Sequence, residues 1–268
     1  MNKFIYFFVS LFVFSTAGIA QNDTLHVSIQ TNVGIMKGIL FPDVPRHIQT
    51  FVSRAQKGLY NGTLFTRVIK DFMIQGGAPD SRNASPGVRC GFGEKNAEIL
   101  PEKSNNHFNK KGALVAPRQQ ENNPEQKSDM SQFFIVQGKV YTKGQLDTLE
   151  QIQNKEIRKK ALMKYYIPKR SNLLQLKKEN KTLYMMRLRK ILKVVHDEVA
   201  ATPGHLFFTP EQRKAYTTIG GCQHLDGEYT IFGQLTEGLD LIDKIANQPK
   251  DKYNRPLKDI RIIKVSIF

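Results

Sequence analysis

The sequence predicts a mainly β domain that is interrupted by a helical insertion. Apolar and polar residues alternate from Leu25 to Gln30, which is typical of a strand with one buried face. Between Leu188 and Val199 the apolar residues recur instead at helical spacing, on one face of a helix. The charge changes with this pattern, because residues 143–214 hold 17 Lys or Arg and 7 Asp or Glu, and so carry most of the net charge of +16.

The amino-terminal elements of the β domain are short. The alternating strand at 25–30 is followed by a turn at Thr31–Gly34, and a second strand is expected from Ile35 to Phe41. A helix over Pro45–Lys57 begins with a proline, which suits a first helical turn, and should end at Gly58.

An arginine lies in the next predicted strand, within the run from Phe65 to Gly77. If side chains alternate strictly, Arg67 shares a strand face with Phe65 and Ile69. A charge on an apolar face is costly to bury unless it has a partner or a function. Arg67 is therefore a candidate functional residue.

Three helices are predicted in the basic middle of the chain. The first runs from about Gln145 to Tyr166, and the second runs from about Ser171 to Ala200. A shorter helix begins at Thr209, because Thr, Pro and Gln at positions 209, 210 and 212 form a capping pattern. We expect the two long helices to fold back on each other.

The first 20 residues are typical of a signal peptide. Lys3 supplies the positive end, Phe4–Phe14 is apolar apart from Ser10, and Gly18–Ala20 offers small residues before a cleavage site. The alternative is a retained membrane anchor, for which the apolar stretch is short compared with a span of about 20 residues. We therefore expect an exported protein, periplasmic or secreted, that is cleaved near Ala20.

Three sequence blocks, Phe65–Gly77, Ser131–Val136 and Leu225–Gly233, together resemble the cyclophilin family of peptidyl-prolyl cis/trans isomerases. The resemblance includes Val44–Val52 and Gly112–Leu114. It implies an exported bacterial member of the family, with a closed antiparallel barrel of eight strands and a helix over each end. The implied domains are a signal peptide at 1–20, an isomerase domain at 21–140 and 218–268, and a basic helical insertion at 141–217.

The resemblance also implies the roles of the site residues. Arg67 corresponds to the donor that acts on the prolyl amide, and Gln75 and Phe72 complete the catalytic group. The walls of the proline pocket correspond to Phe72, Met73, Phe134 and Leu225, and Gln75 and Gln132 correspond to polar positions that support the arginine and the bound backbone. The implied reaction needs no metal or other cofactor, and its substrates are proline-containing unfolded or extended polypeptides.

Three of the expected substrate-binding residues, Pro117, Tyr229 and His224, depart from the common family pattern. Pro117 and Arg118 stand where Ala-Asn or Ala-Arg is usual, and Pro117 has no N–H, so a substrate contact survives there only if it uses the backbone of residue 118. Tyr229 stands where many members have His. His224 replaces a Trp whose indole helps to bind cyclosporin, so weak binding of this drug is expected.

Structural alternatives remain for several of these residues. Phe72, Met73 and Phe134 can be barrel core instead of pocket wall, and core is the preferred reading for Phe133 and Phe232. Arg67 can be the partner of a structural ion pair, and Gln132 can be a surface residue. The six histidines show no ligand-like spacing with Cys or carboxylates, which argues against a metal site.

Three functions are therefore compatible with the sequence. The first is an isomerase that assists the folding of exported proteins, and the second is a non-catalytic module that binds proline segments. The third is a chaperone scaffold that acts through the insertion at 141–217, where the basic charge suits an acidic partner or an anionic surface. No nucleic acid is expected as a partner of an exported protein. Cys90 and Cys222 are either bridged or free in such a chain.

Overall fold

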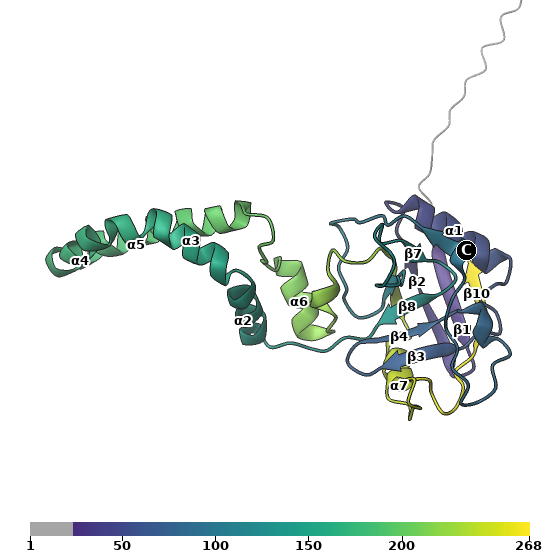
Figure 1. The fold of residues 1–268 in the computed structure, drawn as a ribbon. Helices are drawn as coiled ribbons and strands as arrows, with labels where there is room; N and C mark the ends of the chain where they lie inside the picture. Colours follow the sequence, from purple (N-terminus) through teal and green to yellow (C-terminus); the bar gives the residue numbers. More distant parts are fainter. Residues whose placement is uncertain (1–23) are drawn as a thin grey trace, which may run out of the picture.

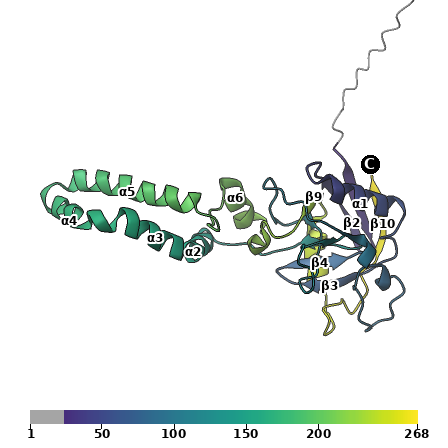
Figure 2. The same cartoon turned by 45° about the horizontal axis from the view of Figure 1, so that its top comes forward.

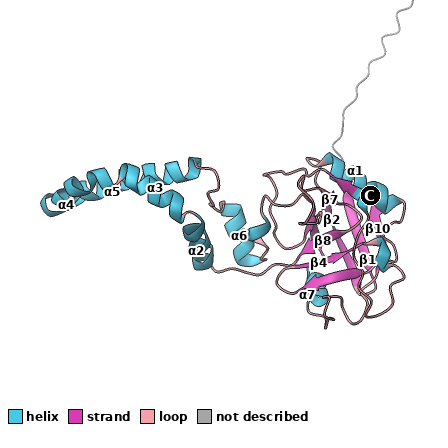
Figure 3. Cartoon of the chain, viewed as in Figure 1, coloured by secondary structure: helices cyan, strands magenta, loops and turns pink. Residues whose placement is uncertain are grey.

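The computed structural model of the protein describes residues 24–268 as a β-barrel from which a long helical arm projects (Figure 1). The predicted signal peptide at 1–20 lies outside the described residues. None of the helices from residue 24 onward is both long enough and apolar enough to span a bilayer. Figure 3 shows the division clearly, with strands confined to the barrel and most helices in the arm.

One antiparallel sheet of eight strands forms the barrel wall, with the order β10-β1-β2-β9-β6-β8-β4-β3. The bounds of these strands, in chain order, are β1 His26–Thr31, β2 Gly34–Leu40, β3 Phe65–Ile69, β4 Met73–Gly76, β6 Ala113–Val115, β8 Phe133–Val136, β9 Ile231–Glu237 and β10 Ile262–Ile267. A separate small sheet pairs β5, Glu98–Ile99, with β7, Ser128–Asp129.

The sheet curls until its two edge strands, β3 and β10, approach each other. The closing contact is an isolated antiparallel bridge between Leu64 and Arg261. It is flanked by hydrogen bonds from Gly62 N to Ile262 O and from Ile262 N to Thr63 O, both of 2.8 Å. The predicted eight antiparallel strands are confirmed, whereas the closing seam is a short bridge just outside the strands and not a continuous ladder.

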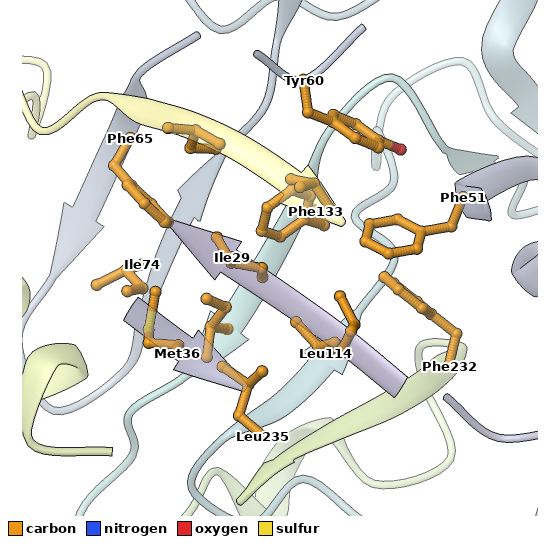
Figure 4. Close-up of a cluster of buried hydrophobic side chains, with 14 of the residues drawn as sticks. Ile29, Met36, Phe51, Tyr60, Phe65, Ile74, Leu114, Phe133, Phe232 and Leu235 are labelled. Atoms are coloured by element: carbon orange, nitrogen blue, oxygen red, sulfur yellow. The ribbon is translucent and has the colours of Figure 1, made fainter. Parts of the chain in front are cut away.

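Inward-facing side chains of the strands fill the barrel. The core includes Ile29, Met36, Leu114, Phe133 and Phe232, all with no exposed surface (Figure 4). The core assignments of Phe133 and Phe232 are therefore confirmed. Two helices, α1 (Pro45–Gln56) and α7 (Leu239–Ala246), lie at opposite ends of the barrel and add apolar residues to the same core (Figure 1). Short 3-10 turns at Pro79–Ser81, Lys95–Ala97 and Gln223–Leu225 complete the barrel.

The arm, residues 143–207, is a helical hairpin that extends away from the barrel (Figure 2). Its outgoing limb consists of α2 (Lys143–Gln153), α3 (Lys155–Tyr165), a 3-10 turn at Ile167–Lys169 and α4 (Arg170–Glu179). Its returning limb is a single helix, α5 (Lys181–Ala201), which packs against both α3 and α4. A short helix, α6 (Pro210–Thr218), connects the arm to the barrel.

Two helix boundaries in the arm differ from the sequence prediction. The helix expected at 145–166 breaks at Asn154, whose side chain donates to Leu206 O and accepts from Leu206 N, each at 2.8 Å. The hairpin reverses at Asn180 and not at Pro168. The Asn180 side chain accepts the N–H of Leu183 at 2.9 Å and so caps the start of α5. The predicted capping box of α6 at Thr209 and Gln212 is confirmed.

The two chain segments that join the arm to the barrel lie side by side. Lys139 and Gly221 form an antiparallel bridge with two backbone hydrogen bonds of 3.1 Å. A Cβ atom on Gly138 would lie only 2.2 Å from the carbonyl carbon of Gly221, so this close approach requires glycine. Beside the bridge, Tyr141 and the fully buried Tyr216 pack with Phe108 of the barrel.

Candidate active site

A β-bulge in β3 directs Arg67 away from the barrel core. Phe65 pairs with Gly76 and Arg67 pairs with Gln75, so two residues advance on β3 while one advances on β4. Phe65 and Val68 consequently lie in the core, while Arg67 is exposed. The expectation that Phe65 shares the face of Arg67 is wrong, because strict alternation fails at Thr66.

In the part of the chain that the structure describes, no carboxylate forms an ion pair with the guanidinium of Arg67. The arginine ion pairs formed within residues 24–268 use Arg46, Arg54, Arg118, Arg213 and Arg255 instead. Desolvation by the adjacent wall lowers the pKa of Arg67, and the nearby Tyr229 raises it in part. The side chain remains a cation at neutral pH. The structure therefore does not support the alternative of a structural ion pair for Arg67.

Gln75 is held beside Arg67 by a chain of polar contacts. The Gln75 Nε2 donates to Gln132 Oε1 at 2.9 Å, and Gln132 Nε2 donates to Asp129 Oδ2 at 2.8 Å. The other carboxylate oxygen of Asp129 accepts from the backbone N–H of Ser131 at 2.9 Å. Because Gln132 is buried and engaged on both sides, the alternative of a surface residue is wrong.

Asp129 is a supporting residue that the sequence motifs did not identify. Its signal in the sequence is the Asp-x-Ser pattern, since an Asp side chain often accepts the N–H two residues later. Such patterns are frequent in loops. Only the structure shows that Asp129 also fixes the amide of Gln132, and therefore the orientation of Gln75.

The predicted pocket residues gather on the outer face of the barrel wall, opposite the core. They form a separate apolar cluster in which Met73, Phe134 and Leu225 are buried and Phe72 and Tyr229 are partly buried. Alternation along β8 explains the separation, because Phe133 enters the core cluster and Phe134 enters the outer one. The alternative that Phe72, Met73 and Phe134 belong to the barrel core is therefore not supported.

His224 lies against the pocket wall at the position of the expected Trp. Its ring stacks on Phe72 with a centroid distance of 5.7 Å. Burial lowers the pKa of His224, with a partial opposing effect of Asp226, so the ring is neutral at pH 7. The histidine thus supplies a small, neutral surface at the edge of the pocket.

Arg118 and Tyr229 form the other side of the site. The Arg118 guanidinium lies 4.7 Å from the Tyr229 ring centre and donates to Glu228 Oε2 at 3.0 Å. The Tyr229 ring meets Phe134 edge-on at 5.8 Å. Pro117 is buried, and its carbonyl accepts the N–H of Asp129 at 2.7 Å. Of the eleven predicted site residues, Arg67 lies on β3, Met73 and Gln75 on β4, and Phe134 on β8. The other seven lie in the loops next to β4, β6, β8 and β9 and in the 3-10 turn Gln223–Leu225.

The two cysteines lie apart and are free. The Cys222 thiol donates to the Phe72 carbonyl, with a sulfur–oxygen distance of 3.3 Å. Burial raises the pKa of this thiol to about 12, so it stays protonated. Between residues 24 and 268 no group of three or more His, Cys, Asp or Glu side chains is arranged to hold a metal ion.

Comparison with known proteins relates the chain to one family. The family model described as cyclophilin-type peptidyl-prolyl cis-trans isomerase/CLD matches residues 26–164 and 210–267. The match continues from the barrel into α2 and α3 and resumes at α6, so residues 165–209 fall outside it.

Related sequences occur in staphylococci. A protein of Staphylococcus saprophyticus that is named among the peptidyl-prolyl cis-trans isomerases is 30% identical over 248 residues, which are 92% of this chain and 93% of that protein. A protein of Staphylococcus haemolyticus with the same name is 27% identical over the same length.

A similar fold is found in a solved structure. It is a cyclophilin-type peptidyl-prolyl cis-trans isomerase of Cryptosporidium parvum, determined in the presence of the dipeptide Ala-Pro. It is 19% identical, with a TM-score of 0.51 over 91% of this chain and 98% of that one. At this identity the likeness concerns the fold.

Proposed function

The chain belongs to the cyclophilin-type peptidyl-prolyl cis-trans isomerase family, and we propose that it accelerates rotation about X-Pro bonds during the folding of exported proteins, with Arg67 as the group that lowers the barrier. The barrier of about 18–20 kcal/mol comes from the partial double bond of the amide. In the twisted transition state the prolyl nitrogen is pyramidal and carries a lone pair. A donor aimed at that lone pair stabilises the transition state more than either planar isomer.

The observation that carries this proposal is the unpaired guanidinium of Arg67 beside the outer apolar cluster. The bulge at Thr66 turns it out of the core, and no carboxylate of the described chain occupies its donors. An arginine with five fixed donors and a permanent charge suits an amide nitrogen. No acid, base or nucleophile has to act.

The remaining site residues have complementary roles in the proposed mechanism. Met73, Phe134 and Leu225 form the apolar wall that holds the pyrrolidine ring. Gln75, fixed through Gln132 and Asp129, orients the arginine and contacts the bound backbone. Phe72 and His224 border the pocket.

Export is supported by the sequence of the first 20 residues, with Lys3 before the apolar run Phe4–Phe14. An exported isomerase would act on polypeptides that fold after crossing the membrane. Fractionation of the source cells and sequencing of the mature amino terminus test this part. Cleavage near Ala20 supports export, and an uncleaved protein in the cytosolic fraction contradicts it.

The isomerase activity itself is tested with the mature protein and a proline-containing tetrapeptide. Exchange between the cis and trans forms is followed by NMR, which reports binding and turnover separately. Accelerated exchange supports the proposal. Binding without acceleration contradicts it and favours a non-catalytic module for proline segments.

A further inference from the structure

We propose that the arm recruits unfolded, acidic polypeptide segments into a groove along α2, α3 and α5 and so delivers them to the Arg67 site; this inference rests on the proposed isomerase function. The groove consists of two hollows that share Gln151 and Arg158. We call this continuous feature the arm groove.

The arm groove has an apolar floor. Val195 and Val199 of α5 lie at its base, with Leu162 of α3 and Phe207 beside them. Towards the tip, Met163 and Ile167 line the groove with 62% and 53% of their surfaces exposed. The floor therefore offers accessible apolar surface at the exposed end, where a partner could cover it.

Exposed apolar side chains are concentrated in the arm. Eight of the nineteen large apolar residues exposed between residues 24 and 268 lie between Ile152 and Val194. A two-helix hairpin can bury only one stripe of each helix, which leaves the flanks uncovered. Three of these eight are methionines, Met163, Met185 and Met186, whose flexible side chains adapt to varied partners.

The charge of the distal arm indicates the chemistry of the occupant. Residues 155–193 hold 14 Lys or Arg and only 2 Asp or Glu. Among the described residues, only Lys164 and Lys193 of these basic side chains form ion pairs, with Glu198 and Asp197. Lys155, Arg158 and Lys159 lie directly on the groove. A segment with acidic groups next to apolar ones would complement both the floor and the rim.

The shape of the groove favours a polypeptide over an anionic membrane surface. The apolar floor is recessed between helices, and Val195 and Val199 are each only 3% exposed. A flat bilayer could touch only the exposed end at Met163 and Ile167, whereas single side chains of an extended segment could also enter the recessed inner part. Asp147 and Glu150 at the inner end of the groove are ion-paired with Arg213, so the acidic groups of the segment are expected at the outer end, beside Lys155, Arg158 and Lys159.

The attachment of the arm explains how binding there would serve the Arg67 site. The Phe72 carbonyl, in the pocket wall, accepts the backbone N–H groups of Gln137 and Gly138, where the chain leaves the barrel for the arm. The returning chain passes Cys222 and Leu225, and Leu225 is part of the same wall. A polypeptide held in the arm groove is therefore tethered next to the pocket, which raises its local concentration there.

The test compares two double variants of the mature protein that change exposed residues of the same kind. Met163→Gln with Ile167→Gln alters the arm groove, and Leu174→Gln with Met186→Gln alters exposed arm positions that line neither hollow. The probe is a reduced and carboxymethylated polypeptide of net negative charge, whose binding is followed by fluorescence anisotropy. Circular dichroism checks that both variants retain their helices.

The groove variant should bind the acidic probe about tenfold more weakly, because about two large apolar contacts are lost, while the control variant should bind like the parent. The groove variant should turn over a tetrapeptide at the parent rate. Its acceleration of the proline-limited refolding of a whole polypeptide should decrease in proportion to its weaker binding of the probe. Equal weakening in both variants, or no binding of the probe by the parent, would overturn the inference.

Vesicles of phosphatidylglycerol and phosphatidylcholine in equal parts test the membrane as the occupant. The proposal expects the acidic polypeptide to bind in their presence. The inference would be overturned if the vesicles displaced the polypeptide and if Met163→Gln with Ile167→Gln weakened vesicle binding as much as polypeptide binding. Binding of the probe without any tetrapeptide turnover would instead refute the isomerase function and leave the polypeptide-binding groove in place.

Discussion

The carbonyl oxygen of Phe72 accepts the backbone N–H of Gly138 at 2.9 Å, so the wall of the proline pocket and the base of the arm are hydrogen-bonded to each other. On the other side of this contact, Gly138 lies against Gly221, where the chain returns from the arm. The arm therefore begins and ends beside the pocket, although its helices extend far from the barrel. This relationship motivates a deletion experiment.

Removal of residues 143–207, with a linker of about six Gly and Ser residues, should leave the barrel folded and active on tetrapeptides. A linker of this length has a small entropic cost, because the two segments that join the arm to the barrel already pair at Lys139 and Gly221. Removal of 141–217 should instead destabilise the protein by about 3 kcal/mol or more, because it also removes the buried Tyr216. The Tyr216 hydroxyl donates to the partly buried Asp226 at 2.5 Å. Urea unfolding of both proteins measures the difference, and equal stability would contradict the assignment of Tyr216 to the barrel.

Cyclosporin should bind weakly, because His224 offers a smaller surface than the Trp found in many family members. The ring stacks on Phe72 and leaves less apolar area for the drug. Titration calorimetry measures the affinity of the parent and of His224→Trp, which should bind more tightly. Nanomolar-class binding by the parent would show that this position does not limit the interaction.

Gln132→Ala should lower kcat/KM on a tetrapeptide by about two- to tenfold, the effect of one hydrogen bond. The substitution removes the acceptor of the Gln75 amide and the donor to Asp129. Gln175→Ala, which removes a comparable amide from the arm, is the matched control. Parent-like kcat/KM in a folded Gln132→Ala protein would mean that the polar chain does not position Gln75.

The barrel should become less stable as the pH falls below the ordinary pKa of histidine, about 6.5. Burial lowers the pKa of His47, and the hydrogen bond to Glu102 only partly opposes this effect. Below that pH the unfolded chain binds a proton that the folded chain does not, so the stability present above about 6.5 is progressively lost. Urea midpoints at about pH 7.5 and about pH 5.5 measure this change. His47→Gln should reduce the dependence, and a midpoint that rises on acidification would contradict the burial of a neutral His47.

Much of the site was predictable from the sequence because it lies in compact motifs. Met73 and Gln75 lie on one strand, and Phe72 directly precedes it. Alternation along β8 predicts that Phe133 and Phe134 point to opposite faces of the sheet. The bulge at Thr66 was not predictable from alternation, because it depends on pairing with β4 across the sheet. The role of Asp129 required its distance to Gln132.

In the arm, too, the features that depend on local sequence were predictable, whereas the feature that depends on tertiary packing was not. Helical periodicity predicts helices at about 145–166 and 171–200, and the capping residues of α6 predict its start at Thr209. The reversal at Asn180 was missed because an asparagine and a proline are both plausible ends for a helix. Packing of α5 against both α3 and α4 selects Asn180 and leaves Pro168 within a nearly continuous limb.

The most direct test of the central claim is the tetrapeptide turnover of Arg67→Ala, with Arg187→Ala as the matched control in the arm. Loss of one transition-state hydrogen bond of about 2–3 kcal/mol should lower kcat/KM by a factor between about thirty and about a hundred and sixty. Arg187→Ala should retain the parent value, and circular dichroism should show that both variants are folded. Parent-like kcat/KM in folded Arg67→Ala would contradict the role of Arg67 as the group that lowers the barrier.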